Sequence, residues 1–168
     1  MRARARRLAL ALGVAVASGA CVSIDGGAVE ASWVVHAQDG RAIRDCACSD
    51  PAIASVYLEL VGQGDLAGQR PCESGGAPRA ECTFVCGRQT GATPFDIPPG
   101  AYAIRAVPAD ASGQDLTQAV PGRAVVVSPA SILRDVVRGQ ATEIEASLLK
   151  AACAGDCGGD DTARTCRK

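Results

Sequence analysis

The segment 93–107, TPFDIPPGAYAIRAV, places a turn between two stretches of alternating apolar residues. A period of two is typical of β-strands, and Pro99-Gly100 suits the two central positions of a type II turn. Only glycine adopts a positive φ there without strain, so Gly100 is the least replaceable residue of the segment. The segment therefore predicts two strands joined by a corner. The alternating apolar residues are Phe95, Ile97, Tyr102, Ile104 and Ala106.

The first 20 residues predict an export signal. Four arginines lie among the first seven residues, an apolar run of about ten residues follows at 8–17, and small residues end the segment. The run is too short to span a bilayer as a helix, which takes about 20 residues. We therefore expect an exported chain and no spanning helix in this segment.

Small residues that run directly into Cys21 resemble the lipobox of bacterial lipoproteins, in which that Cys is acylated and becomes the mature N-terminus. The family usually has Leu where this chain has Ser18, and Ser18 with Ala20 also satisfies ordinary signal cleavage at the same bond. The chain has nine Cys; acylation of Cys21 would leave eight, which can all pair in an oxidising compartment. Because Val22 is not Asp, the resemblance implies the outer membrane.

The charge of the mature chain argues against nucleic acid as a partner. Four of the 17 Lys and Arg and none of the 18 Asp and Glu precede Cys21, which leaves 13 basic residues against 18 acidic ones and a net charge of −5. Affinity for phosphates depends on clustered Lys and Arg. With few aromatic residues and many small ones, the core needs covalent support from disulfides. The aromatic residues are Trp33, Tyr57, Phe84, Phe95 and Tyr102.

We expect four segments: a signal at 1–20, a lipidated tether at 21–29, a β domain at 30–150 and a Cys-rich tail at 151–168. Alternation and turn signals predict about seven short strands in the β domain and no strong amphipathic helix, which favours an antiparallel β-sandwich. In addition to the two strands of the corner, the predicted strands are 30–37, 53–61, 81–86, 123–128 and 143–149, with Ile144, Ala146 and Leu148 facing inward. The segment 132–137 suits either a helical turn or a strand, and 62–78 is expected to be a surface loop.

Three motifs together are similar to the carboxypeptidase regulatory-like, prealbumin-like sandwich domains. They are FDIPPGAYAI at 95–104, the Asp-x-Ser-Gly loop at 110–113, and GQATEIE at 139–145. The similarity covers about residues 30–150, and the Cys insertions depart from the usual pattern. It implies a non-catalytic accessory or adhesive module, and no functional residues carry over.

Strand geometry restricts how the cysteines pair. In an extended strand, Cys82 and Cys86 would lie about 13 Å apart, beyond the reach of a disulfide. Their expected partners are Cys46, Cys48 and Cys72. Five mature Cys lie upstream and three in the tail, so full oxidation would require a bridge between tail and body. The disulfide candidates are Cys46, Cys48, Cys72, Cys82, Cys86, Cys153, Cys157 and Cys166.

No pattern in the sequence favours catalysis, a metal or another cofactor. His36 is the one histidine and no G-x-S-x-G motif accompanies it. A thiol oxidoreductase would need Cys-x-x-Cys, which is absent. Zinc at the two Cys-x3-Cys pairs is less favoured than disulfides in an exported chain. Asp110, Ser112 and Asp115 lack the glycine and the terminal glutamate of an EF-hand loop, so we expect a solvated turn.

These observations predict a non-enzymatic, lipid-anchored envelope protein that acts as a structural or protein-interaction module, with other envelope proteins as candidate partners. The alternative is a small-ligand or carbohydrate-binding surface module that uses the loop ends of the sandwich. The candidate residues are Cys21 for lipidation, the eight other cysteines for disulfides, and Pro99, Gly100 and Tyr102 for the turn.

Overall fold

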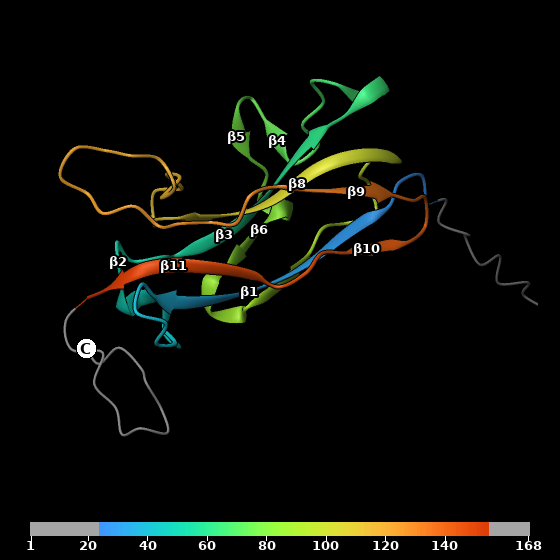
Figure 1. Ribbon diagram of the computed structural model, residues 1–168. Helices are drawn as coiled ribbons and strands as arrows, with labels where there is room; N and C mark the ends of the chain where they lie inside the picture. Colours follow the sequence, from blue (N-terminus) through green and yellow to red (C-terminus); the bar gives the residue numbers. More distant parts are fainter. Residues whose placement is uncertain (1–23, 155–168) are drawn as a thin grey trace, which may run out of the picture.

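The computed structural model describes residues 24–154, which form an all-β fold (Figure 1). No α-helix occurs among these residues, and the chain turns instead through four short 3-10 helices. The strands are β1 (Ala28–Ala37), β2 (Ser49–Asp50), β3 (Ser55–Gly62), β4 (Glu73–Ser74), β5 (Ala77–Pro78), β6 (Thr83–Val85), β7 (Thr90–Ala92), β8 (Gly100–Ala109), β9 (Ile132–Val136), β10 (Ala141–Glu143) and β11 (Ser147–Cys153). The 3-10 helices are η1 (Cys46–Cys48), η2 (Gly64–Leu66), η3 (Ala80–Cys82) and η4 (Cys86–Arg88).

The strands form two main sheets and one hairpin. A five-stranded sheet has the order β10-β1-β11-β2, with β7 also paired to β1, and a four-stranded sheet has the order β6-β3-β8-β9. The hairpin β4–β5 stands apart from both and projects from the β3 and β8 side of the molecule in Figure 1. Buried residues from both main sheets belong to one hydrophobic cluster.

The alternating inward residues of the three long strands β1, β3 and β8 build much of this cluster. On β1, Trp33 and Val35 are buried while Val34 and His36 point outward. This is the period of two that a half-buried strand requires, and the faces of these strands are as the sequence predicted. The other inward residues of these strands include Val56, Leu58 and Leu60 of β3 and Tyr102, Ile104 and Ala106 of β8.

Tyr102 secures the start of β8. Its ring is fully buried, and its hydroxyl donates a hydrogen bond to the carbonyl of Pro98 at 2.9 Å. A tyrosine that bonds back to the preceding backbone is the tyrosine corner found in β-sandwich domains. The strand predicted to precede Pro99-Gly100 is absent, because Phe95 and Asp96 form a turn and Ile97 makes only an isolated bridge to Gly27.

The prediction of purely antiparallel pairing is wrong for β1. This strand runs parallel to both β10 and β11, with Glu30 opposite Glu143 and Val34 opposite Leu148. Between β10 and β11 the contact with β1 continues through the hydrogen bond from Ile144 N–H to the Glu30 carbonyl, at 2.9 Å. Alternation shows which face of a strand is buried but carries no information on the direction of its neighbour.

The interruption between β10 and β11 also shifts the predicted inward face. Ile144 is buried as expected, but Ala146 is exposed and Leu148 points outward, while Leu149 and Ala151 are buried. A slip of one residue exchanges the two faces of a strand. The predicted inward face is therefore correct at Ile144 and wrong at Ala146 and Leu148.

The strand predicted at 123–128 is a loop. Val126 is buried and Val127 forms only an isolated bridge to Lys150. The side chain of Arg123 folds this segment back, since its guanidinium donates to Gln114 Oε1 at 2.9 Å and to the carbonyl of Asp115 at 3.1 Å. These bonds hold residues 110–123 as a compact arm. Segment 132–137, for which helix and strand were both open, is strand β9 over most of its length.

Both ends of the domain lie beyond the predicted limits. Gly26 and Gly27 of the expected tether are buried, and a Cβ on Gly26 would meet the carbonyl oxygen of Ile97 at 2.6 Å. At the other end β11 continues to Cys153, past the predicted boundary at residue 150. The segment 62–78, expected to be a plain loop, contains η2 and the β4–β5 hairpin.

Gly100 opens β8 with a φ of +147°, and a Cβ at this position would contact Cδ1 of Leu66. We expect Gly100→Val to lower the free energy of unfolding by about 1–3 kcal/mol, because the backbone is held in a region that suits glycine. Urea unfolding measures this loss. Because Leu66 itself packs against the core, Leu66→Ala is measured alone and combined with Gly100→Val; relative to Leu66→Ala, the double variant should recover only the steric part of the loss. An unchanged unfolding midpoint for Gly100→Val would contradict the conclusion that the backbone at this position requires glycine.

Candidate functional site

The disulfide Cys46–Cys86 joins the two main sheets at one end. Cys46 begins η1, which leads into β2 of the five-stranded sheet, and Cys86 follows β6 of the four-stranded sheet. Their Cα atoms lie 6.1 Å apart and their sequence separation is 40. The indole N–H of Trp33 on β1 donates to the carbonyl of Cys86 at 2.9 Å. A covalent bond and a buried hydrogen bond thus hold the same residue against the other sheet.

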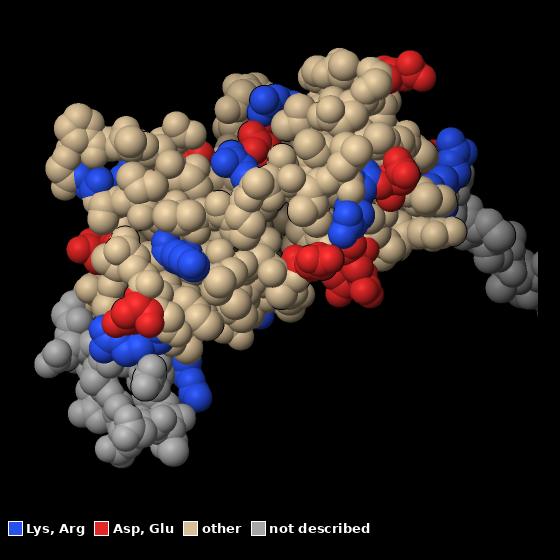
Figure 2. Space-filling view, viewed as in Figure 1, with Lys and Arg blue, Asp and Glu red and all other residues tan. Residues whose placement is uncertain are grey.

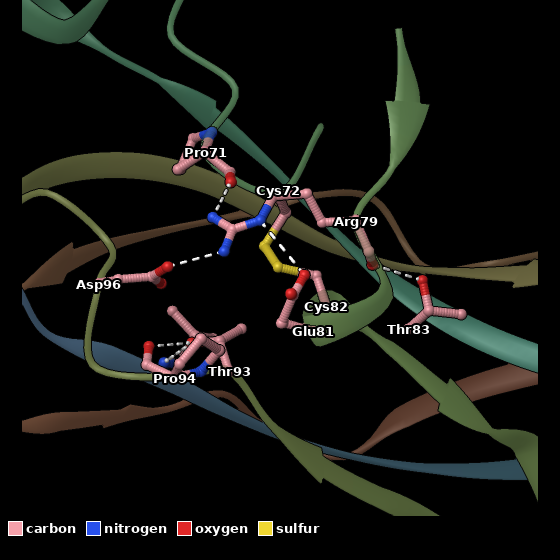
Figure 3. The surroundings of a disulfide bond; sticks show 10 residues. Pro71, Cys72, Arg79, Glu81, Cys82, Thr83, Thr93, Pro94 and Asp96 are labelled. Carbon is pink, nitrogen blue, oxygen red and sulfur yellow. Dashed lines mark hydrogen bonds and ion pairs between the residues drawn. A yellow bond between two sulfur atoms is a disulfide. The ribbon is translucent and has the colours of Figure 1, made fainter. Parts of the chain in front are cut away.

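The disulfide Cys72–Cys82 fixes the β4–β5 hairpin, which lies between its two cysteines. Their Cα atoms are 5.6 Å apart, and the backbone N–H of Arg79 donates to the carbonyl of Cys72 at 2.8 Å. The guanidinium of Arg79 donates to the carbonyl of Pro71 at 2.9 Å and to Oδ2 of Asp96 at 2.7 Å (Figure 3). The base of the hairpin is therefore held from both sides.

Cys82 and Cys86 take different partners from the expected group of three, so the predicted partners are confirmed. They do not lie within one strand, however, because 3-10 helices at both ends shorten β6 to three residues. Cys48 is a free, buried thiol, so the expectation that all mature cysteines pair is wrong. With three residues per 3-10 turn, Cys46 and Cys48 point in different directions, and only Cys46 faces Cys86.

Because Cys48 is a free thiol, the requirement for a bridge between the tail and the body, which assumed that all eight cysteines pair, no longer holds. Cys153 ends β11 and is disulfide-bonded, while Cys21, Cys157 and Cys166 lie outside the described residues. With one upstream cysteine unpaired, the counts no longer require a bridge between tail and body.

A groove of about 370 Å³ lies on the outer face of the four-stranded sheet. Ser55 and Tyr57 of β3 form its floor together with Ala109 of β8. Residues of β5 and η3 stand on one side, including Pro78, and Ser112 of the 110–123 arm stands on the other. The groove could not be predicted from the sequence, because its residues come from distant segments. Its only signal was the outward face of β3, which carries Tyr57.

Tyr57 is the aromatic residue of the groove, and its surroundings keep its hydroxyl neutral. Burial, followed by the carboxylates of Asp115 and Glu59, raises the pKa of Tyr57 to about 12. Glu59 itself is ion-paired with Arg105 at 2.8 Å and with Arg70 at 3.2 Å. Within residues 24–154, the hydroxyls of Tyr57 and Ser55 make no hydrogen bond. The floor of the groove therefore presents two hydroxyl groups that are open to a ligand.

The other candidate positions carry ordinary structural contacts. Oδ1 of Asp110 accepts hydrogen bonds from the N–H and hydroxyl of Ser112 and from the N–H of Gln114, and the bond from the Ser112 hydroxyl contributes most to lowering the pKa of Asp110. His36 lies on the outer face of β1 opposite Lys150. In the part of the chain that the structure describes, no three His, Cys, Asp or Glu side chains are grouped to hold a metal ion.

Charges are dispersed on the surface shown in Figure 2, where Lys and Arg lie singly or beside acidic residues. Across residues 24–154, no helix has the length and apolar character to span a membrane. The chain matches no family model, and neither curated proteins nor solved structures include a significant match. The similarity to lipoproteins and to carboxypeptidase regulatory-like domains therefore stays a prediction.

The raised pKa of Tyr57 predicts a specific alkaline transition. In the folded state the hydroxyl keeps its proton above the ordinary value of 10. Its contribution to stability is complete below pH 10 and is lost as the pH rises towards 12. Phenolate absorbance at 295 nm, as the difference between wild type and Tyr57→Phe, should titrate with a midpoint of about 12. The variant is needed because burial raises the pKa of Tyr102 as well. A midpoint near 10 would contradict the buried, acidic surroundings of Tyr57.

Proposed function

We propose that the chain is a lipid-anchored protein of the bacterial cell envelope whose β domain acts as a structural or protein-interaction module. The observation that carries this proposal is the pair of disulfides, Cys46–Cys86 and Cys72–Cys82, which indicate an oxidising, extracytoplasmic environment. The basic, apolar and small-residue parts of segment 1–20 supply a route to that environment, and Cys21 follows them directly.

The proposed architecture is a β-sandwich. The inward faces of β1 and β11 from one sheet and of β3 and β8 from the other contribute to a single core cluster, as two sheets packed face to face would. The Tyr102 corner and the similarity of segment 95–104 to carboxypeptidase regulatory-like domains support the same proposal.

Two outward apolar residues support a role in interaction with other proteins. Val34 of β1 and Leu148 of β11 lie directly opposite each other on the outer face of the five-stranded sheet, and both are more than one-third exposed. Grouped apolar side chains on a surface are typical of contact sites. The proposed module is not an enzyme.

A lipid on Cys21 would hold this domain close to the bilayer. Gly26, the first buried residue of the described range 24–154, is five positions after Cys21. Five residues span at most about 18 Å even when fully extended. The proposal therefore places the β domain at the membrane surface, and the outer membrane is the proposed location.

A second function, small-ligand binding, is favoured by one observation. The groove on the four-stranded sheet has a volume of about 370 Å³, within the range of small-molecule sites, which is about 300–1,000 Å³.

Lipid anchoring is tested by the Cys21→Ser variant. We expect wild type to partition into the detergent phase of a phase-separating detergent and its intact mass to include acyl chains. Cys21→Ser should stay in the aqueous phase or accumulate as the unprocessed precursor, because the variant lacks the acylated thiol. Ser18→Leu is the matched control, since it restores the usual lipobox residue and should preserve anchoring. A wild-type protein that is entirely aqueous, with an unmodified Cys21 as its N-terminus, would contradict the proposal.

A further inference from the structure

The groove on the four-stranded sheet has walls that are already held in place. The hairpin wall is closed at its base by Cys72–Cys82 and tied to the neighbouring turn by the ion pair of Arg79 with Asp96, at 2.7 Å. A site formed before binding loses less entropy when a ligand enters it. Figure 1 shows this hairpin on the side of β3 that faces away from β1 and β11.

The opposite wall is equally ordered. Asp110 accepts three hydrogen bonds from Ser112 and Gln114, and Arg123 donates to Gln114, Asp115 and Gln118 across the arm. Neither wall needs to rearrange for the groove to exist.

The floor combines two hydroxyls with small apolar surfaces. Ser55 and Tyr57 are two residues apart on β3 and face the same side, with Cα atoms about 7 Å apart. Each hydroxyl can both donate and accept a hydrogen bond. Most of the remaining lining is apolar, with Pro78 on one wall and Ala109 on the floor. A mostly apolar site with a few polar groups is typical of small-ligand recognition.

The charges around the floor favour a ligand without net charge. The carboxylate of Glu59 is paired with Arg70 and Arg105, and that of Asp115 accepts hydrogen bonds from Thr117 and Gln118. None of the described residues that line the groove is charged, so a charged ligand would find no ion-pairing partner there. Burying either charge without a partner is costly.

We infer that this groove binds one neutral sugar unit of a glycan, with the Tyr57 and Ser55 hydroxyls as its hydrogen-bonding partners. A sugar ring carries an apolar C–H face and hydroxyls that both donate and accept, which matches the mixed floor. A peptide added as a strand would need a free sheet edge, whereas this groove lies over the face of β3 and β8. The inference specifies the ligand of the second proposed function and does not depend on the lipid anchor.

The test is an NMR titration of the mature full chain, in a detergent without a sugar head group. The probes are glucose, galactose, mannose and N-acetylglucosamine, with glucuronate and glucosamine as the charged controls. We expect at least one neutral sugar to shift the amide resonances of Ser55, Tyr57 and Ser112, and the charged sugars to bind more weakly.

Variants separate the site from other surfaces. Tyr57→Phe should weaken binding about tenfold, the loss of one well-formed hydrogen bond, and Ser55→Ala should weaken it in the same direction. Ser32→Ala is the matched control, since it removes a hydroxyl from the outer face of β1 and should leave the affinity unchanged. The inference is overturned if no neutral sugar shifts these resonances, if glucuronate or glucosamine binds as tightly, or if Ser32→Ala weakens binding as much as Ser55→Ala. None of these results bears on whether Cys21 is acylated.

Discussion

The contact between Trp33 and Cys86 is the constraint on which the arrangement of the two sheets depends. The chain leaves the four-stranded sheet after β6 and enters the five-stranded sheet at β7, and Cys86 lies at this crossing. The indole N–H holds its carbonyl, and the bond to Cys46 closes a loop of about 40 residues, worth about 4 kcal/mol in the chain-entropy account. Within residues 24–154, Trp33 and Tyr102 are the only aromatic residues that are fully buried, and this covalent support adds to a core built mainly of Val, Ile and Leu side chains.

The second disulfide constrains an element of the surface instead of the core. Cys72–Cys82 stabilises a hairpin that contributes little to the core but forms one wall of the groove. Arg79 and Arg123 have the same role on the two walls, since each guanidinium donates hydrogen bonds to one carbonyl oxygen and one side-chain oxygen or more. Arginine suits this task because its planar donor array reaches several acceptors at once. The proposed recognition site is thus an ordered surface held by disulfide and arginine contacts.

Sequence patterns predicted the strands whose two faces differ most in polarity. Alternation located β1, β3 and β8 and their buried faces. Cys82 and Cys86 do take other partners, as predicted, although they do not share the extended strand from which this was argued. The same patterns failed where tertiary contacts decide the outcome. They did not predict the parallel partners of β1 or the shifted inward face of β11. They also predicted a strand at 123–128, where Arg123 instead bonds back to Asp115 and the segment is a loop. Cys48 and the groove were missed for a related reason. The pairing of a thiol and the meeting of Ser55, Pro78 and Ser112 depend on residues that are distant in sequence.

The most direct test of the central constraint is a disulfide map of the native protein. Unfolding in acid with a maleimide present, followed by pepsin, limits exchange, and cleavage after Phe84 separates Cys82 from Cys86. Fragmentation between Cys46 and Cys48, which stay on one peptide, then shows which of the two is linked and which carries the maleimide. The structure predicts that the Cys86 peptide is linked to Cys46, that the Cys82 peptide is linked to Cys72, and that Cys48 carries the maleimide. A peptide that links Cys48 to Cys86, with Cys46 carrying the maleimide, would contradict this account of how the sheets are joined.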